Sequence, residues 1–308
     1  MIIECLYLLS SLHLPPYAFH LQLTTMSKNK VIGIDLGATN VRGAQVTEAG
    51  MGPVTAARIR SNGSMEDVLE DIFAVADKLM DETVAAIGIG VPGVVDVEEG
   101  IVYDVQYIPS WVEVPLKQRL QERYKVPAFV NNDANCFALG EYYFGKGKNT
   151  VNMIGLTLGT GMGAGIIINR HLYAGPNCGA GEFGMVQYLD HVFEYYCSGQ
   201  FFQNVYQLDG GDVFKQAQDG DMKAQALYAE MGMHLGNAIK MIMYTYDPSL
   251  IIFGGSVRFA YPYFQEAMWD RIKTFAFKKS IDRLSIQLSD LESSGILGAA
   301  GLYYDSVK

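Results

Sequence analysis

The sequence predicts an α/β protein made of two similar domains, and three observations lead to this prediction. A chain of 308 residues is long enough for about two domains, each with its own core. Short apolar runs typical of buried strands are followed by segments with helical spacing. One pattern also occurs twice, because residues 32–38 (IGIDLGA) and 154–160 (IGLTLGT) share an aliphatic strand and a glycine turn. We therefore expect each domain to open with a glycine-turn hairpin.

The composition excludes several classes of partner. Hydrophobic residues make up 49% of the chain and charged residues 18%, which is typical of a compact globular protein. The net charge of −10 provides no basic surface for nucleic acid or for an anionic membrane. No apolar run approaches the ~20 residues that span a bilayer. The four cysteines (Cys5, Cys136, Cys178 and Cys197) have neither metal-like nor disulfide spacing, so we expect a reducing cytoplasm.

The first 25 residues differ from the rest of the chain. They carry apolar runs around Pro15-Pro16, with one acidic residue and no Lys or Arg. A secretory signal would begin with positive charge, so the segment does not fit one. We expect residues 1–25 to be an extension outside the fold, and a segment docked on the fold is the alternative.

The first half of the chain is predicted to contain strands at 31–37, 41–46 and 54–60, a helix at 64–80, and a strand at 84–91. Ser64 and Asp67 have the spacing of a capping box at the start of that helix. Asp35 lies inside the first apolar strand, where a carboxylate costs several kcal/mol unless it is paired or binds a cation. Asp35 is therefore either a cation-binding residue or a buried acid satisfied by neighbouring amides.

Two glycine-rich segments match nucleotide-binding signatures by their letters alone. Gly88, Gly90 and Gly93 have the dinucleotide spacing, but Pro92 and the residues after it do not open a helix. Residues 145–150 contain the letters of a Walker motif without its spacing, and a strand follows them. Any nucleotide would therefore be held by other backbone turns.

Polar residues gather at Asn131-Asn132-Asp133, about two-fifths of the way along the chain. A predicted helix at 112–124 leads to a short strand at 126–130, and helical spacing resumes at Ala134. The three polar residues thus lie at the carboxyl end of a strand that enters a helix, where open α/β sheets bind ligands. Capping of the helix is the alternative, because Asn and Asp are preferred N-cap residues.

The second half begins with the repeated hairpin and is predicted to continue with a loop at 179–185, helices at 194–206 and 221–246, a buried strand at 250–254 and a last helix at 293–304. Glycines let backbone N–H groups approach a phosphate closely, and such concave turns attract anions. Two glycine turns in matching positions are a stronger signal than one. Gly254-Gly255 follows a buried strand and suits a nucleotide base or sugar, or is a plain strand–helix turn.

With its motifs in this order, the sequence resembles the ROK sugar kinases, bacterial glucokinase-like enzymes of the actin-like ATPase fold. Residues 35–40 (DLGATN) look like the first phosphate motif of that family, and residues 158–165 (LGTGMGAG) look like the second. Gly254-Gly255 looks like the adenosine motif. Asn132-Asp133 matches the sugar-binding Asn and the catalytic Asp. The resemblance covers about residues 31–304.

The sequence departs from the family pattern in one loop. Family members read Glu-x-Gly-His followed by a cysteine cluster that binds zinc with that His, whereas Glu182-Phe-Gly-Met185 is followed by no cysteine at 187–192. The chain rejoins the pattern at Glu194, which matches the second sugar-binding acid. The resemblance therefore implies a sugar kinase that lacks the zinc site.

The resemblance implies phosphoryl transfer from ATP, with Mg²⁺, to a small-molecule sugar, at the 6-hydroxyl of a hexose. Asp133 would be the general base, and Asp35 would hold Mg²⁺ through water. Asn132, Glu182 and Glu194 would bind sugar hydroxyls. The implied ATP- and phosphate-binding residues are Asp35, Gly37, Ala38, Thr39, Asn40, Gly159, Thr160, Gly161, Gly254 and Gly255.

The resemblance also implies an architecture: a two-lobed, ribonuclease H-like fold with a cleft between the lobes. Residues 26–130 and 293–308 would form a small N-terminal α/β lobe, and residues 131–292 a large C-terminal α/β lobe. The family is commonly dimeric or tetrameric, so a homodimer or homotetramer is expected.

Three other classes of protein compete with a kinase. ROK-like repressors carry an N-terminal helix-turn-helix, which 25 apolar residues cannot supply, and the acidic charge argues against DNA. A chaperone-type ATPase of the same fold would not need Asn132, Glu182 and Glu194. The alternative that stays open is a ROK-like sugar-binding protein with degenerate catalysis. Glucose, mannose, fructose and N-acetyl hexosamines all remain possible sugars.

Overall fold

Two sheets with the same strand arrangement organise the protein. The structure is a computed structural model that describes residues 28–308, so the predicted extension at 1–25 lies outside the described residues. The first sheet has the order β3-β2-β1-β5-β9, and the second has the order β12-β11-β10-β15-β16. In both sheets a glycine-turn hairpin pairs with a parallel strand on its first arm. The predicted repeat is thus confirmed.

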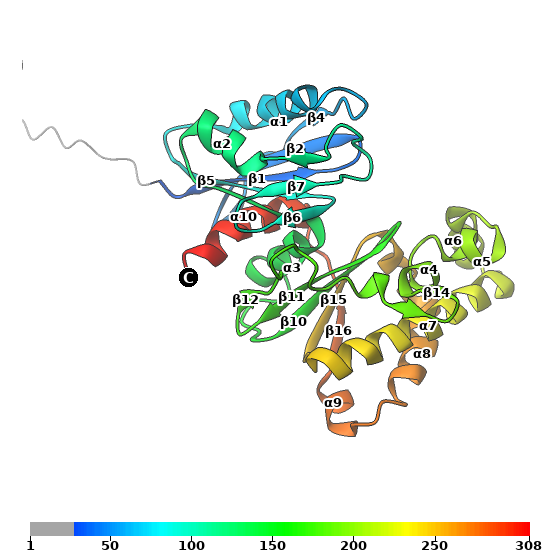
Figure 1. The fold of residues 1–308 in the computed structure, drawn as a ribbon. Coiled ribbons are helices and arrows are strands. Elements are labelled where there is room, and N and C mark those ends of the chain that lie inside the picture. The colour runs from blue at the N-terminus through cyan, green and yellow to red at the C-terminus, as the bar shows by residue number, and fades with distance from the viewer. Residues whose placement is uncertain (1–27) are drawn as a thin grey trace, which may run out of the picture.

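The first sheet consists of β1 (Lys30–Leu36), β2 (Asn40–Thr47), β3 (Gly50–Met51), β4 (Thr55–Arg58), β5 (Val84–Val91) and β9 (Ala128–Asn132). Helix α1 (Met65–Leu79) covers β2 and β4 with an apolar face, and α2 (Leu116–Tyr124) packs on β9. The predicted capping box is confirmed, because Ser64 Oγ accepts a hydrogen bond from Asp67 N at 3.2 Å. Figure 1 shows both helices on one side of this sheet.

The predicted helix at 112–124 was too long at its start. Glu113–Val114 forms the strand β8, which pairs with β7 (Ile101–Tyr103) and through it with β6 (Val94–Asp96). The helix begins only at Leu116, after Pro115. Pairing with β7 makes these residues a strand, and proline is well tolerated at the start of a helix.

The second sheet consists of β10 (Met153–Leu158), β11 (Met162–Ile168), β12 (His171–Leu172), β15 (Leu250–Gly254) and β16 (Ser285–Leu288). Its outer core is formed with α7 (Met222–Tyr246) and α8 (Tyr261–Ile272), which pack on each other. The helices α6 (Gly210–Gln218) and α9 (Lys278–Arg283) complete this half. Within residues 28–308, no helix is long and apolar enough to cross a membrane.

Two helices, α3 (Asp133–Tyr143) and α10 (Ser294–Ser306), lie between the sheets and pack on each other (Figure 1). Glycines make this approach possible: a Cβ at Gly298 would lie 1.5 Å from the Cys136 carbonyl oxygen, and one at Gly33 would lie 2.1 Å from that of Ile296. The last helix therefore packs closely on both α3 and β1. It also fixes the start of α3, where the polar residues lie.

The predicted helix at 194–206 is two helices, α4 (Phe193–Cys197) and α5 (Phe201–Tyr206). Ser198 leaves the helix with an extended backbone, φ −99° and ψ 177°. The reason is tertiary: Gly199 N donates a hydrogen bond to Gly159 O at 2.7 Å, which ties the break to the second glycine turn. Before α4 come a 3₁₀ turn, η1 (Phe183–Met185), and a hairpin of β13 (Gln187–Tyr188) and β14 (His191–Val192).

Candidate active site

The carboxyl end of β9 presents the polar residues as predicted. Asn132 is the last residue of the strand, and Asp133 is the first residue of α3. The capping interpretation is confirmed, because Asn132 Oδ1 accepts a hydrogen bond from Ala134 N at 2.8 Å, and ligand binding by these residues stays a prediction. Asn132 Nδ2 donates to Gly93 O at 3.2 Å. Asp133 Oδ1 also accepts from Ala134 N, at 2.9 Å, and its Oδ2 has no hydrogen-bond partner among residues 28–308.

Asp133 has the electrostatic setting of a base. Its side chain retains exposed surface, but neighbouring protein displaces much of its water, and this loss of hydration raises its pKa to about 6. The negative charges of Asp35 and Glu182 raise the pKa further, while the Ala134 N–H bond lowers it. The structure thus brings Asp35, Asp133 and Glu182 within electrostatic range, although they are far apart in sequence. A carboxylate with such a pKa is ionised at neutral pH and can accept a proton.

The first glycine turn joins β1 to β2 and carries polar side chains. Gly37 N donates to Asn40 O at 2.9 Å, and Asn40 Nδ2 donates to Thr39 Oγ1 at 2.9 Å. Asp35, half-buried at the end of β1, pairs with Arg42 on β2, Nη2 to Oδ2, at 2.7 Å. The sequence analysis missed Arg42. The hairpin register could have found it, because it places Arg42 directly opposite Asp35.

The second glycine turn joins β10 to β11 and is held mainly through its backbone. Gly159 N donates to Gly161 O at 3.0 Å, and Glu194 Oε2 accepts from Met162 N at 2.9 Å. A Cβ at Gly161 would lie 2.6 Å from Glu194 Oε2, so the acid lies directly against the turn. Glu194 also contributes to the raised pKa of Glu182, after burial as the main cause. The two predicted sugar-binding acids are therefore neighbours.

A cavity of about 400 Å³ lies beside the second turn. Its lining includes Gly159, Thr160, Gly199, Phe214, Tyr228 and Val257. A Cβ at Gly159 would meet no atom within 4 Å, so the turn has open space beside it. The cavity is large enough and aromatic enough for a nucleoside.

The predicted adenosine turn, Gly254-Gly255, adjoins this cavity through the 3₁₀ helix η2 (Ser256–Ala260). Gly255 has φ +74°, and a Cβ there would lie 2.1 Å from Leu158 O, so only glycine fits. A Cβ at Gly254 would lie 2.5 Å from the Phe137 ring, so Gly254 is small for packing reasons. Gly199 lines the same cavity but was not predicted as a site residue. The Ser198-Gly199 pair inside the predicted helix at 194–206 could have indicated it, because such a pair interrupts a helix.

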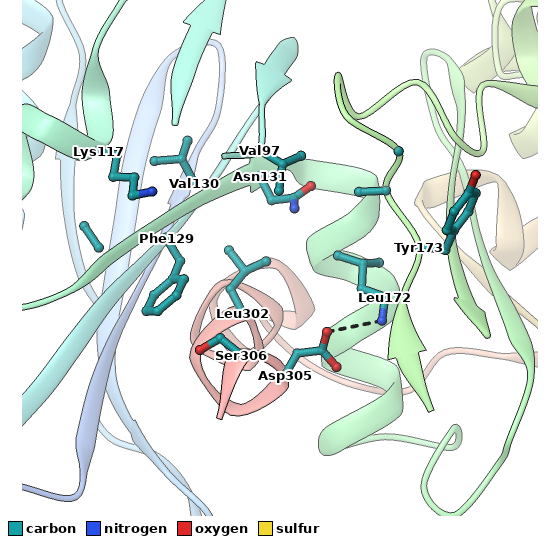
Figure 2. Close-up of a pocket in the computed structure, with 13 residues that line it drawn as sticks. Val97, Lys117, Phe129, Val130, Asn131, Leu172, Tyr173, Leu302, Asp305 and Ser306 are labelled. Carbon is teal, nitrogen blue, oxygen red and sulfur yellow. Dashed lines mark hydrogen bonds between the residues drawn. The ribbon is translucent and has the colours of Figure 1, made fainter. Parts of the chain in front are cut away.

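A second cavity, of about 370 Å³, is lined by residues of β9 and α10 (Figure 2). Its lining includes Phe129, Asn131, Leu302 and Asp305 but none of the predicted site residues. Asn131 lines this cavity, whereas the side chain of Asn132 bonds to Gly93 O. The figure also shows Asp305, which accepts a hydrogen bond from Leu172 N at 3.2 Å. This cavity is distinct from the candidate active site.

The loop that departs from the family pattern is packed by aromatic side chains. Tyr188 stacks on Phe193 with centroids 4.3 Å apart, and Phe183 packs edge-on against Tyr246 at 5.6 Å. Met185 is 61% exposed. In the described part of the chain, no three His, Cys, Asp or Glu side chains are grouped to hold a metal ion.

Comparison with known proteins adds to this geometry. The sequence model of the ROK family matches residues 31–306. A glucokinase from Thermotoga maritima is 28% identical over 92% of this chain and 99% of its own length. A xylose repressor from Bacillus subtilis is 27% identical over 89% of this chain and 77% of its own.

Among solved structures, a ROK family glucokinase from Streptomyces griseus in complex with glucose and AMPPNP has a TM-score of 0.72. It is 26% identical, and the match covers 89% of this chain and 98% of that one. The fold of this chain is the two-lobed α/β fold of the actin-like ATPases, as the sequence predicted.

Proposed function

The chain belongs to the ROK family, and from this premise we propose that it is an ATP-dependent sugar kinase. The observation that carries the proposal is the position of Asp133: an ionisable carboxylate with one unbonded oxygen, at a strand end, in the field of Asp35 and Glu182. We propose that the acceptor is a hexose and that its 6-hydroxyl is phosphorylated. Asp133 would accept the hydroxyl proton as the phosphoryl group is transferred.

Sugar binding is proposed to involve Asn132, Glu182 and Glu194. Carboxylates accept hydrogen bonds from hydroxyls, and an amide can both donate and accept. Asn132 Oδ1 is already bonded to Ala134 N, and Glu194 Oε2 to Met162 N, so each keeps only part of its capacity for a sugar. The mutual proximity of Glu182 and Glu194 supports a shared hydroxyl-binding surface.

ATP is proposed to bind between the two glycine turns, with its adenosine in the cavity beside η2. The fit rests on the open space at Gly159 and on the aromatic lining of the cavity. Turn amides, Thr39, Asn40 and Thr160 would hold the phosphates. Mg²⁺ fits a carboxylate that reaches it through water, and Asp35 is the carboxylate at the first turn. Bound Mg²⁺ would neutralise charge that develops on the phosphates.

We also propose the lobe boundaries given above, an assembly of two or four copies, and a cytoplasmic location. The two sheets and their separate cores support the division into lobes. The buried free cysteines Cys136, Cys178 and Cys197 support a reducing compartment.

The second candidate function is sugar binding without kinase activity. The xylose repressor among the relatives of this chain supports it. ADP release, coupled to a colour reaction, should be measured over a panel of hexoses with Mg²⁺ and ATP present. We expect sugar-dependent ADP release for at least one hexose, and a fall of about 10²- to 10⁴-fold in Asp133→Asn. Sugar binding by calorimetry without any ADP release would favour the second candidate.

A further inference from the structure

The helix that carries Glu194 cannot be stable on its own. Helix α4 has five residues, and its N-cap, Val192, makes no side-chain hydrogen bond to it. Isolated helices shorter than about 12 residues are marginal in water, so tertiary contacts must hold α4 in place. The position of Glu194 therefore depends on what packs against this helix.

Tyr188, on the strand β13, packs against α4 on both sides of Glu194. Its ring stacks on Phe193 at 4.3 Å with an interplanar angle of 14°, and it meets Tyr196 edge-on at 5.6 Å. Residues 193 and 196 are neighbours on one face of a helix. The ring of Tyr188 thus contacts the helix one residue before Glu194 and two residues after it.

The hydroxyl of Tyr188 is anchored on the long helix α7. Asn237 Nδ2 donates to it at 2.8 Å, and His234 Nδ1 lies 3.2 Å from it. A hydroxyl can accept one bond and donate another, so Tyr188 accepts from Asn237 and donates to His234 Nδ1. Burial lowers the pKa of His234, which favours the neutral ring that this arrangement requires.

We propose that Tyr188 is a positioning residue for Glu194: it fixes α4 to α7, and it thereby sets the affinity for sugar. This proposal rests on the proposed role of Glu194 in sugar binding. The second glycine turn keeps two other ties, Gly159 N to Gly161 O and Gly199 N to Gly159 O. ATP binding should therefore depend much less on Tyr188 than sugar binding does.

The test compares Tyr188→Phe with Tyr206→Phe. Tyr206 also donates its hydroxyl to a side chain of α7, Glu230, but it belongs to α5 and its ring packs on Phe201 rather than on α4. Both variants keep the ring and lose the bonds of its hydroxyl to α7, two in Tyr188→Phe and one in Tyr206→Phe, so both melting temperatures should fall. Only Tyr188→Phe should raise the KM for sugar, by about three- to ten-fold, with the KM for ATP changed less than about two-fold.

A third variant leaves Tyr188 intact and removes the partner of its hydroxyl on α7. Asn237→Leu should raise the sugar KM as Tyr188→Phe does, and the double variant should add little, because both changes remove the same anchor. Equal sugar KM values in Tyr188→Phe and Tyr206→Phe, or fully additive effects of the pair, would overturn the proposal.

Sugar affinity measured by calorimetry without ATP keeps the two proposals apart. If the wild type binds sugar but releases no ADP, the kinase assignment fails while the role of Tyr188 is still measured by the binding constant. If Tyr188→Phe binds sugar as tightly as the wild type in an active kinase, only the positioning role fails. A wild type that binds no sugar overturns both.

Discussion

The two glycine turns hold the same place in their sheets, yet they present different chemistry. When the repeats are aligned, Asp35 of β1 corresponds to Thr157 of β10. Asp35 pairs across its hairpin with Arg42, whereas Thr157 Oγ1 donates to Gly163 O across its own at 3.2 Å. The first turn therefore carries an ion pair and the second carries none at that position.

Their surroundings differ in the same sense. Thr39 and Asn40 of the first turn are exposed side chains, while the second turn has one exposed polar side chain, Thr160, and its backbone packs against Glu194 and Gly199. The repeated strand–turn–strand unit thus has an ion pair and two exposed polar side chains at the first turn, and a backbone held by a following helix at the second. We infer that a cation is held at the first turn alone and that the second turn depends on the helix behind it.

Among the variants that compare the two turns, the largest effect should come from the aligned pair itself. Asp35→Asn removes the carboxylate proposed to hold Mg²⁺ through water, and loss of an outer-sphere ligand costs about 10- to 100-fold in activity. Thr157→Val removes only one neutral hydrogen bond and should change kcat less than about three-fold. Steady-state rates at graded Mg²⁺ check this, with the Asp35→Asn loss largest at low Mg²⁺. Equal losses in the two variants would show that the turns are not chemically different.

The next effect concerns the glycines. An alanine at Gly161 would put its Cβ 2.6 Å from Glu194 Oε2, so the acid must leave Met162 N. A hydrogen bond to a charged group contributes about 1.5–3 kcal/mol, so Gly161→Ala should raise the sugar KM about ten-fold or more. An alanine at Gly37 would meet Asn40 O at 3.3 Å, which a small shift relieves, so Gly37→Ala should leave the sugar KM within about two-fold. Initial-rate kinetics with each substrate varied measure these KM values. A sugar KM raised more in Gly37→Ala than in Gly161→Ala would contradict the prediction.

The pH profile tests the charge of the first turn. Asp133 must be ionised to accept a proton, and its pKa is raised to about 6, so kcat/KM for sugar should fall as pH falls through 6. For one ionisation this gives a loss of about ten-fold between pH 7 and pH 5.

The variants used for the aligned pair sharpen this profile. Because Asp35 raises the pKa of Asp133, Asp35→Asn should move the acid limb to lower pH, and Thr157→Val should leave it in place. An unmoved limb in Asp35→Asn would mean that Asp35 does not contribute to the raised pKa of Asp133.

Much of this architecture could be predicted from local sequence, because the repeated hairpins and the strand-to-helix junction at Asn132 depend on short-range pattern. What could not be predicted depends on contacts between distant segments. The break at Ser198 exists because Gly199 bonds to Gly159, and the strand at Glu113–Val114 exists because β7 pairs with it. The anchoring of Tyr188 by α7 is of the same kind, since no local pattern connects residues 188 and 237.

Aromatic side chains pack the loop before α4, which supports the second turn. Such a loop should not respond to a chelator, whereas a metal-bound loop would. Phe183 and Phe193 are 6% and 5% exposed, and Tyr188 is packed between α4 and α7. Burying an apolar side chain of this size contributes about 1.5–3 kcal/mol to stability. The three aromatic side chains together can therefore hold a short loop in one conformation.

The smallest effect is therefore expected from removing zinc. The loop contains Met185 where the family has a histidine, and no cysteine lies at 187–192. A zinc-selective chelator, with Mg²⁺ kept saturating, should change neither the activity nor the melting temperature, because aromatic packing rather than a metal fixes α4 and through it Glu194. Elemental analysis should find no stoichiometric zinc in the purified protein. About one zinc per chain, or a chelator-induced rise in the sugar KM, would mean that the second turn has a metal-dependent support after all, and the contrast between the turns would then lie in which metal each one uses.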